Sequence, residues 1–135
     1  MDRPRVLVVD DDPSLLETLF ALLEDEFDVT TAPDGPKALE LLESEDYLVV
    51  CADFKMPGMD GIELLRQVTQ RPVCTSGLLM TGHMDVLGRP EWLEGRTVGV
   101  VFKPCEPDQL IDNIRQLAEL ALMRRRVGTA PRRKT

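Results

Sequence analysis

Short apolar runs alternate along this chain with longer segments in which apolar residues recur every three or four positions. The short runs, several of them rich in valine, predict five buried strands at residues 5–9, 27–32, 48–52, 77–80 and 98–102. The longer segments predict helices at residues 13–23, 37–44, 61–70 and 107–123. This alternation predicts an α/β fold: a five-stranded parallel sheet with right-handed crossovers, doubly wound by helices on both faces.

Proline, glycine and aspartate mark where several of these elements begin. Asp12 is expected to cap the first helix with Pro13 at its first position, and residues 33–36 (Pro-Asp-Gly-Pro) should form a turn before the second helix. Two glycines and a proline interrupt residues 88–95, just before the last strand. We therefore expect a fifth helix there, short or distorted, that begins near Pro90.

Charge divides the chain into two parts. All 24 acidic residues but only ten of the 16 basic ones lie before Arg124, so residues 1–123 carry a net charge of −14 and residues 124–135 carry +6. The first part has the length of one domain. Its acidity argues against nucleic-acid binding by the folded domain, whereas the basic tail could touch phosphates or an acidic partner. We interpret this tail as a solvated, disordered terminus.

The remaining composition bears on the cellular compartment. No apolar run is long enough to cross a bilayer, and the amino terminus leads straight into a strand rather than a signal peptide. Cys51, Cys74 and Cys105 are odd in number and lack metal-site spacing, which fits a reducing compartment. We expect a cytoplasmic protein without membrane insertion.

Polar residues follow four of the predicted strands. Asp10 and Asp11 follow the first strand, Asp53 the third, Thr81 the fourth and Lys103 the fifth. Because the carboxyl ends of parallel strands share one edge of the sheet, these side chains can converge on one site. Each residue alone could equally be a helix cap, a turn residue or a solvated loop lysine. Their joint position at strand ends favours a functional site.

This set of residues suits phosphoryl chemistry. Three clustered carboxylates repel one another unless they share a cation, and oxygen ligands on a sheet rim suit Mg²⁺. A carboxylate beside that metal can attack a phosphoryl group and form an acyl phosphate. Lys103 would neutralise charge on the transferred oxygens, and the Thr81 hydroxyl could bond one of them. A contact made only in the modified state can bias a conformational switch.

Four segments of the chain resemble the receiver domain of bacterial two-component response regulators, of the chemotaxis-receiver type. They are Val-Leu-Val-Val-Asp-Asp-Asp at 6–12, Asp-Phe-Lys-Met-Pro-Gly-Met-Asp-Gly at 53–61, Met-Thr-Gly-His at 80–83 and Phe-Lys-Pro at 102–104. The second is highly specific, and together they span almost all of residues 1–123. The resemblance implies a flavodoxin-like three-layer sandwich with strand order 2-1-3-4-5 and five helices.

The same resemblance implies roles for individual residues. Asp53 would be the phosphoacceptor. Mg²⁺ would be held by the carboxylates of Asp11 and Asp53 and the backbone carbonyl of Lys55, with Asp10 acting through a bound water. Thr81 and Lys103, already placed at the same edge, would bind the phosphoryl group.

The resemblance also implies partners. The phosphoryl group would come from a histidine of a partner kinase or phosphotransfer domain and would shift a pre-existing equilibrium between two conformations. The domain would signal to a downstream protein that the sequence does not identify. Formation of a homodimer is a further possibility. It would catalyse only its own phosphorylation and dephosphorylation. Lys55 and His83 occupy positions next to the site whose residues, in the family, often influence the rate at which the phosphoryl group is lost.

Two positions and one segment depart from the family pattern. Val100 stands where the family usually has a tyrosine or phenylalanine whose rotation couples to the threonine. Phe102 points to the same side of the strand but lies two residues further on. Cys105 replaces the usual phenylalanine, and residues 88–95 fall on a helix that the family commonly uses for output and dimer contacts. We therefore expect a smaller or different conformational response around Val100.

Two other functions are open to such a chain. A pseudo-receiver would keep the fold and act by protein contacts alone, but the intact Asp11, Asp53, Thr81 and Lys103 argue against it. A metal-dependent phosphohydrolase would need a further acid/base carboxylate and a cap over the substrate, for which the chain is too short. DNA contact through the tail would be weak, because no helix-turn-helix accompanies it. The chain is either a stand-alone receiver or one cut at its linker.

Overall fold

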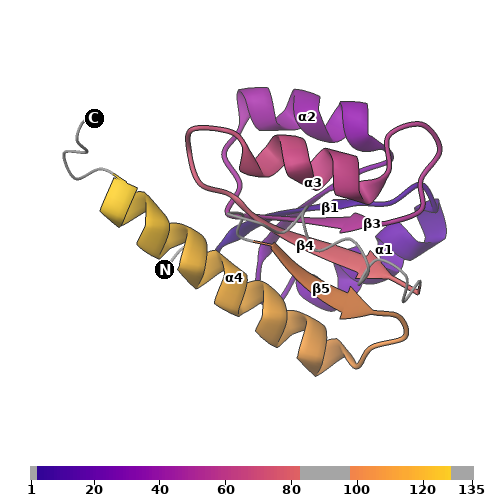
Figure 1. Cartoon of the computed structure of the whole chain (residues 1–135). Coiled ribbons are helices and arrows are strands. Elements are labelled where there is room, and N and C mark those ends of the chain that lie inside the picture. The colour runs from indigo at the N-terminus through magenta and orange to yellow at the C-terminus, as the bar shows by residue number, and fades with distance from the viewer. Residues whose placement is uncertain (1–2, 83–97, 129–135) are drawn as a thin grey trace.

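Five parallel strands form a single sheet in the order β2-β1-β3-β4-β5 (Figure 1). The structure is a computed structural model and describes residues 3–82 and 98–128. The sheet confirms the predicted strand order. The strands are β1 (Arg5–Val9), β2 (Asp28–Ala32), β3 (Val49–Asp53), β4 (Ser76–Thr81) and β5 (Val98–Phe102).

Helices cover both faces of this sheet, as the alternation of elements predicts. Helices α2 and α3 lie on one face, and α1 and α4 lie on the other (Figure 1). The helix that we expect near Pro90 lies outside the described residues. The four described helices are α1 (Pro13–Leu23), α2 (Gly35–Ser44), α3 (Gly61–Thr69) and α4 (Pro107–Gly128).

The side chains of each central strand alternate between two apolar layers. In β1, Leu7 and Val9 pack with α2 and α3, whereas Val6 and Val8 pack with α1 and α4. All four valine and leucine side chains are fully buried. Because successive residues of a strand point to opposite faces, a strand covered on both faces must be apolar at every position. This explains why the sequence shows continuous apolar runs here.

Aspartate caps begin the first three helices. Asp12 accepts a hydrogen bond from Ser14 N at 3.0 Å, as predicted, and Asp60 accepts one from Glu63 N at 2.9 Å. Asp34 accepts from Lys37 N at 2.9 Å, so α2 begins at Gly35 and not at Lys37. Our assignment of residues 33–36 to a turn was wrong for its last two, because proline is tolerated in the first helical turn, where its missing N–H has no partner to lose.

Three of the predicted strands have boundaries that shift by one residue. Phe27 is buried but precedes β2, and β3 runs from Val49 to Asp53, so the aspartate is the last residue of its strand. Strand β4 includes Ser76 and Thr81, one residue more at each end than predicted. Pairing causes the extension of β4: Ser76 lies opposite Val49, and Thr81 lies opposite Phe102.

The last helix is longer than its apolar pattern indicates. Residues 124–128, which we assigned to the disordered tail, are helical. Arg125 binds this end of α4 to the body, donating two hydrogen bonds to the carboxylate of Asp46 at 2.7 and 2.9 Å and one to the carbonyl oxygen of Cys74 at 2.8 Å. Those tertiary contacts continue the helix beyond Met123. No helix in the described ranges is both long enough and apolar enough to cross a membrane.

Candidate functional site

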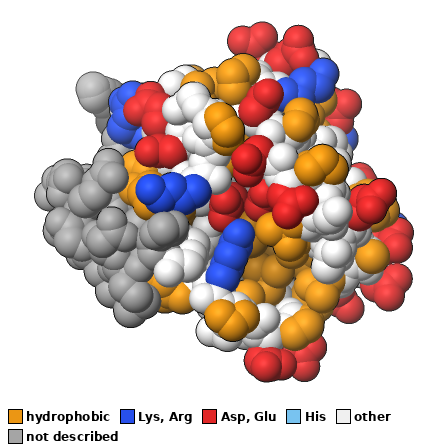
Figure 2. Space-filling view, turned by 90° about the vertical axis from the view of Figure 1, so that its right-hand side faces the viewer, with side chains coloured by type: hydrophobic (Ala, Val, Ile, Leu, Met, Phe, Trp, Pro, Cys, Tyr) orange, Lys and Arg blue, Asp and Glu red, His pale blue; other side chains and the backbone are white. Residues whose placement is uncertain are grey.

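Three carboxylates meet at the carboxyl edge of the sheet. Asp10 and Asp11 directly follow β1, and Asp53 ends the adjacent strand β3, since Val9 lies opposite Ala52. One carboxylate oxygen from each of the three lies within 4.8 Å of the others. Figure 2 shows acidic side chains gathered around the middle of this edge. The structure therefore brings together the three aspartates that the sequence analysis singled out.

Asp10 is the interior member of this cluster. Its side chain is 2% exposed, whereas Asp53 is half-buried and Asp11 is exposed. Asp10 Oδ1 accepts a hydrogen bond from Asp12 N at 2.9 Å, but Oδ2 has no hydrogen-bond partner among the described residues. Burial raises the pKa of this carboxyl group, and the nearby charge of Asp53 raises it further, against the hydrogen bond from Asp12 N.

Lys103 supplies the positive charge of the site. Its ammonium nitrogen lies 2.6 Å from Asp53 Oδ1 and 3.9 Å from Asp10 Oδ2. The backbone N–H of Lys103 donates to the carbonyl oxygen of Thr81 at 2.8 Å, which fixes the lysine just beyond the end of β5. The peptide bond between Lys103 and Pro104 is cis. The predicted lysine thus contacts the predicted phosphoacceptor directly.

Thr81 lies at the same edge, one strand away from Asp53. It is the last residue of β4 and its side chain is 1% exposed. Asp53 pairs with Met80, and Phe54 N donates to the Met80 carbonyl oxygen at 3.0 Å, so β3 and the following loop run beside β4 up to this threonine. Its backbone carbonyl, which accepts from Lys103, links the ends of β4 and β5.

Gly61 holds the loop after Asp53 against the strand end. Its N–H donates to the Phe54 carbonyl oxygen at 3.0 Å, and a Cβ at this position would lie 2.4 Å from the Asp53 carbonyl oxygen and 2.8 Å from Leu79 Cδ1. Only glycine permits so close an approach. From the sequence, Gly61 is expected only to begin the helix at residues 61–70 and to end the family motif at 53–61. The sequence feature that could have indicated this close contact is the position of Gly61 at the start of α3, directly after the capping residue Asp60.

The remaining predicted residues have mixed outcomes. Lys55 is exposed, and its ammonium nitrogen lies 5.4 Å from the centre of the Phe54 ring. Val100 and Phe102 are half-buried on the same side of β5, against the layer formed with α2 and α3, as strand alternation predicts. His83 lies outside the described residues. The Lys55 carbonyl ligand and the modulating roles of Lys55, His83 and Val100 stay predictions.

The cluster fits a hard divalent cation. All of its ligand atoms are carboxylate oxygens, which Mg²⁺ prefers. Asp10 is buried, Asp53 is half-buried and Asp11 is exposed, so water can reach a bound ion and complete its coordination. The unpartnered Oδ2 of Asp10 is a second indication, because a buried carboxylate oxygen without a partner is costly. Asp10, Asp11 and Asp53 are therefore suited to hold Mg²⁺, directly or through water.

Comparison with known proteins identifies the family. The family model described as the response regulator receiver domain matches residues 6–115. The chain belongs to this family. Receiver domains of two-component response regulators take part in phosphorylation-based signalling, interact with histidine kinases or phosphotransfer proteins, and generally bind Mg²⁺ at an acidic aspartate cluster.

Individual relatives agree with this assignment. The receiver domain is 33% identical over 119 residues to the C4-dicarboxylate transport transcriptional regulatory protein DctD of Pseudomonas aeruginosa, covering 87% of this chain and 26% of that protein. It is 36% identical over 109 residues to the transcriptional regulatory protein FixJ of Bradyrhizobium diazoefficiens, covering 80% and 53%. The chain thus spans between a quarter and about half of the length of these two relatives.

A solved structure supports the same conclusion. The receiver domain of the Francisella response regulator 1452 superposes with a TM-score of 0.77 at 29% identity, covering 87% of this chain and 98% of that one. This similarity extends across the sheet and its helices and is not confined to the short motifs. The receiver fold predicted from sequence is therefore confirmed.

Proposed function

We propose that this receiver domain is a phosphorylation-dependent switch in which Asp53 accepts a phosphoryl group from a histidine of a kinase or phosphotransfer domain. The observation that carries the proposal is the contact between Lys103 Nζ and Asp53 Oδ1 at 2.6 Å, beside the carboxylates of Asp10 and Asp11. An acidic cluster by itself suits only a cation and gives no reason to expect an anionic group on Asp53. The lysine adds a counter-charge for an anionic group attached to Asp53.

The transfer reaction assigns a task to each residue. A carboxylate oxygen of Asp53 attacks phosphorus, the bond from phosphorus to the histidine nitrogen breaks, and the imidazole leaves with the electron pair of that bond. Asp11, Asp53 and the Lys55 carbonyl would hold Mg²⁺, with Asp10 acting through water, and the bound ion would supply positive charge to offset that of the phosphoryl oxygens. Lys103 exchanges its contact with the free carboxylate for one with a phosphoryl oxygen.

The conformational output starts at Thr81. Its hydroxyl moves to bond a phosphoryl oxygen, and its carbonyl already accepts a hydrogen bond from Lys103 N at 2.8 Å. A shift of this residue therefore pulls on the ends of β4 and β5 together. Because Val100 lacks the aromatic ring that the family usually carries there, we expect the change around β5 to be smaller than, or different from, that of other receivers.

We further propose that the domain is not an enzyme acting on other molecules, since its described chemistry ends on its own Asp53. A pseudo-receiver, which would bind partners without phosphorylation, is the alternative. The two differ in one property, which is covalent modification of Asp53.

Intact mass measurement with a small phosphodonor such as acetyl phosphate tests the proposal. The wild-type protein should gain one phosphoryl mass with Mg²⁺ present and none with a chelator, and Asp53→Ala should gain none. Asp34→Asn is the matched control, because Asp34 caps α2 from another strand end outside the cluster, and this variant should be modified like the wild type. Amide NMR spectra of the same samples locate the residues that respond.

Two outcomes would count against the proposal. No mass gain under any condition would favour the pseudo-receiver. A mass gain that persists in Asp53→Ala would move the phosphoacceptor to another residue.

A further inference from the structure

A cavity of about 320 Å³ lies at the amino edge of the sheet, opposite the edge that carries Asp53. Its walls come from three segments that are far apart in the sequence: residues 3–5 at the start of β1, residues 46–48 just before β3, and residues 122–125 near the end of α4. The volume lies at the lower end of the range for small-molecule sites and holds a ligand of roughly ten non-hydrogen atoms. We call this cavity the amino-edge pocket.

Arginine dominates the charged lining of the amino-edge pocket. Arg3, Arg5 and Arg125 line it together with a single carboxylate, that of Asp46. Positive side chains therefore outnumber negative ones three to one here, although residues 1–123 carry a net charge of −14. In a domain that otherwise repels anions, this hollow is the opposite: its charge suits an anionic ligand.

Two of these arginines are held in position by the protein itself. Arg125 donates two hydrogen bonds to the Asp46 carboxylate, at 2.7 and 2.9 Å, and one to the Tyr47 carbonyl oxygen at 3.1 Å. Arg5 donates to Glu45, and its guanidinium carbon lies 5.2 Å from the centre of the Tyr47 ring. Because these side chains are already ordered, a ligand that binds them loses little further conformational entropy.

Donors remain for a ligand in spite of these contacts. A guanidinium carries five N–H groups, and the side chains of Arg3 and Arg5 each donate only one hydrogen bond within the described residues, Arg3 to the Glu24 carbonyl oxygen and Arg5 to Glu45. Arg5 also has Asp28 as an ion-pair partner, whereas Arg3 has no carboxylate partner in the ranges that the structure describes. The charge of Arg3 is therefore available to an anion.

The remaining lining of the amino-edge pocket is apolar. It consists of Pro4, Leu48 and Leu122, and Leu122 is 40% exposed. An inorganic anion would bind the arginines but leave this apolar surface in water, whereas an organic anion would also cover it and gain from its burial. The lining thus combines binding groups for an anionic head with a surface for an apolar body.

We propose that the amino-edge pocket binds a small amphipathic organic anion, in which a carboxylate or phosphate group is carried on an apolar body. The head group contacts Arg3 and Arg5, because the planar fork of a guanidinium matches the oxygens of either group. The body packs against Leu48 and Leu122.

Such a ligand would join the start of β1 to the end of α4. Arg125 already attaches this end of the helix to the residues before β3, and a ligand between Arg5 and Leu122 adds a second connection. Binding to the native state should therefore slow amide exchange in the last turns of α4. The proposal does not rest on the proposed function, because the pocket and Asp53 lie at opposite edges of the sheet and binding requires no phosphorylation.

An amide NMR titration of the full chain, in chelator and without phosphodonor, tests the proposal. The probes are phenyl phosphate and benzoate, which share an aromatic ring and differ in the head group. At least one should bind with a dissociation constant on the order of 1 mM and shift the amides of residues 3–5, 46–48 and 122–125. The tighter probe identifies the head group. Inorganic phosphate, which has no apolar body, should bind at least about tenfold more weakly.

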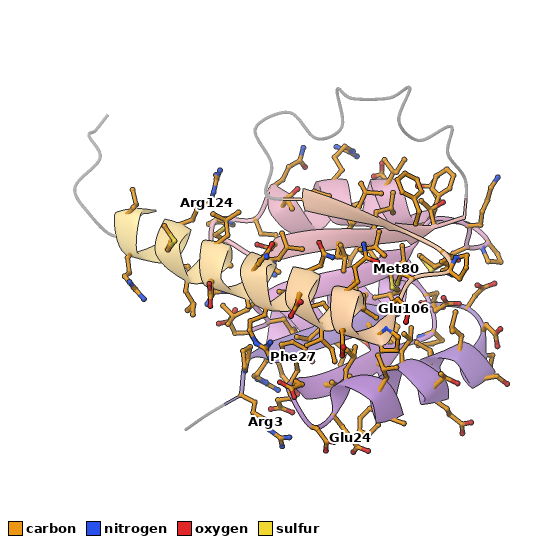
Figure 3. The ribbon with its side chains drawn as sticks, turned by 90° about the horizontal axis from the view of Figure 1, so that it is seen from below. Arg3, Glu24, Phe27, Met80, Glu106 and Arg124 are labelled. Carbon is orange, nitrogen blue, oxygen red and sulfur yellow. The ribbon has the colours of Figure 1, made fainter. Side chains whose placement is uncertain are left out.

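Matched variants test the two halves of the pocket. Arg3→Gln should weaken binding about fivefold, and Arg124→Gln, which removes the same charge outside the lining, should not change it. Figure 3 shows Arg124 on the side of α4 away from Arg3. Leu122→Asp should abolish binding, whereas Leu120→Asp, at a position on α4 that is 36% exposed and outside the lining, should have no effect. Circular dichroism checks that each variant is folded.

Three results would overturn the proposal. The first is the absence of shifts at the pocket with either probe up to about 10 mM, ten times the expected dissociation constant. The second is equal affinity for inorganic phosphate, which would mean an adventitious ion only. The third is binding that survives both Arg3→Gln and Leu122→Asp, which would place the probe elsewhere on the protein.

Discussion

Lys103 and Asp53 form an ion pair at the end of two different strands, with 2.6 Å between Nζ and Oδ1. The strands β3 and β5 are not neighbours, because β4 lies between them. The lysine therefore reaches across the end of β4 to the carboxylate, and its ammonium group lies 3.9 Å from Asp10 Oδ2 as well. A single cation thus partly offsets the mutual repulsion of the aspartates.

Removing this cation should strengthen metal binding. We expect Lys103→Met to bind Mg²⁺ about two- to tenfold more tightly than the wild type, because the competing positive charge beside Asp53 is lost. Isothermal titration calorimetry at low ionic strength measures the change. Lys37→Met is the control, since Lys37 pairs with Glu40 outside the site, and its affinity should not change. Equal or weaker binding by Lys103→Met would show that the lysine does not oppose the metal.

The buried charge of Asp10 should cost the metal-free protein stability. Asp10→Asn keeps an oxygen to accept from Asp12 N but removes a buried charge beside Asp53. We expect this variant to be more stable than the wild type by about 1 kcal/mol in chelator, measured by urea unfolding.

Magnesium should reverse that advantage. Ligand binding to the native state stabilises it, and the wild type has the fuller carboxylate set, so Mg²⁺ should raise its unfolding free energy more than that of Asp10→Asn. Asp34→Asn, which retains a capping side chain on α2, should match the wild type in both conditions. A variant less stable than the wild type in chelator would contradict the argument.

Replacement by alanine should lower stability by different amounts at two nearby glycines, Gly58 in the loop after Asp53 and Gly61 at the start of α3. A Cβ on Gly61 would lie 2.4 Å from the Asp53 carbonyl oxygen, and neither backbone can yield easily, so Gly61→Ala should lower the unfolding free energy by about 2–3 kcal/mol. Gly58 has φ of +77° and open space around it, so Gly58→Ala should cost only about 1 kcal/mol of backbone strain. If urea unfolding gave equal losses of unfolding free energy for the two variants, the structure around residue 61 would have shifted to relieve the contact with Asp53.

The sequence allowed the candidate site to be predicted because strand ends are local features. Asp10, Asp53, Thr81 and Lys103 each end an apolar run or directly follow one, and parallel strands bring such positions to one edge. The relation between the four residues therefore follows from the alternation of strands and helices. Recognition of the family added the strand order, which apolar periodicity alone does not specify.

Features that depend on distant residues could not be predicted in this way. The burial of Asp10 arises from the packing around β1, and the close contact of Gly61 with Asp53 arises from a returning loop. Helix α4 continues past Met123 because Arg125 reaches Asp46 and Cys74, which lie far away in the sequence. Local periodicity contains no information about these contacts.

The ion pair that anchors the end of α4 should make stability depend on pH. The hydrogen-bonded guanidinium of Arg125 lowers the pKa of Asp46 in the folded protein. A carboxyl group with a lowered folded pKa stabilises the native state above its unfolded pKa of about 3.9, and this stabilisation is lost as pH falls through the folded value. Because Asp46 is largely exposed, we expect it to contribute only about 0.5 kcal/mol at neutral pH.

Asp46→Asn tests this dependence. Urea unfolding at pH 7 should show the variant less stable than the wild type, and the difference should shrink as the pH falls through the lowered folded pKa, below which Asp46 is protonated in both states of the wild type. Asp25→Asn is the control, since Asp25 is exposed and has no ion pair among the described residues, and it should show no difference at either pH. A deficit of Asp46→Asn that is the same at both pH values would mean that lost hydrogen-bond geometry, rather than lost charge, causes it.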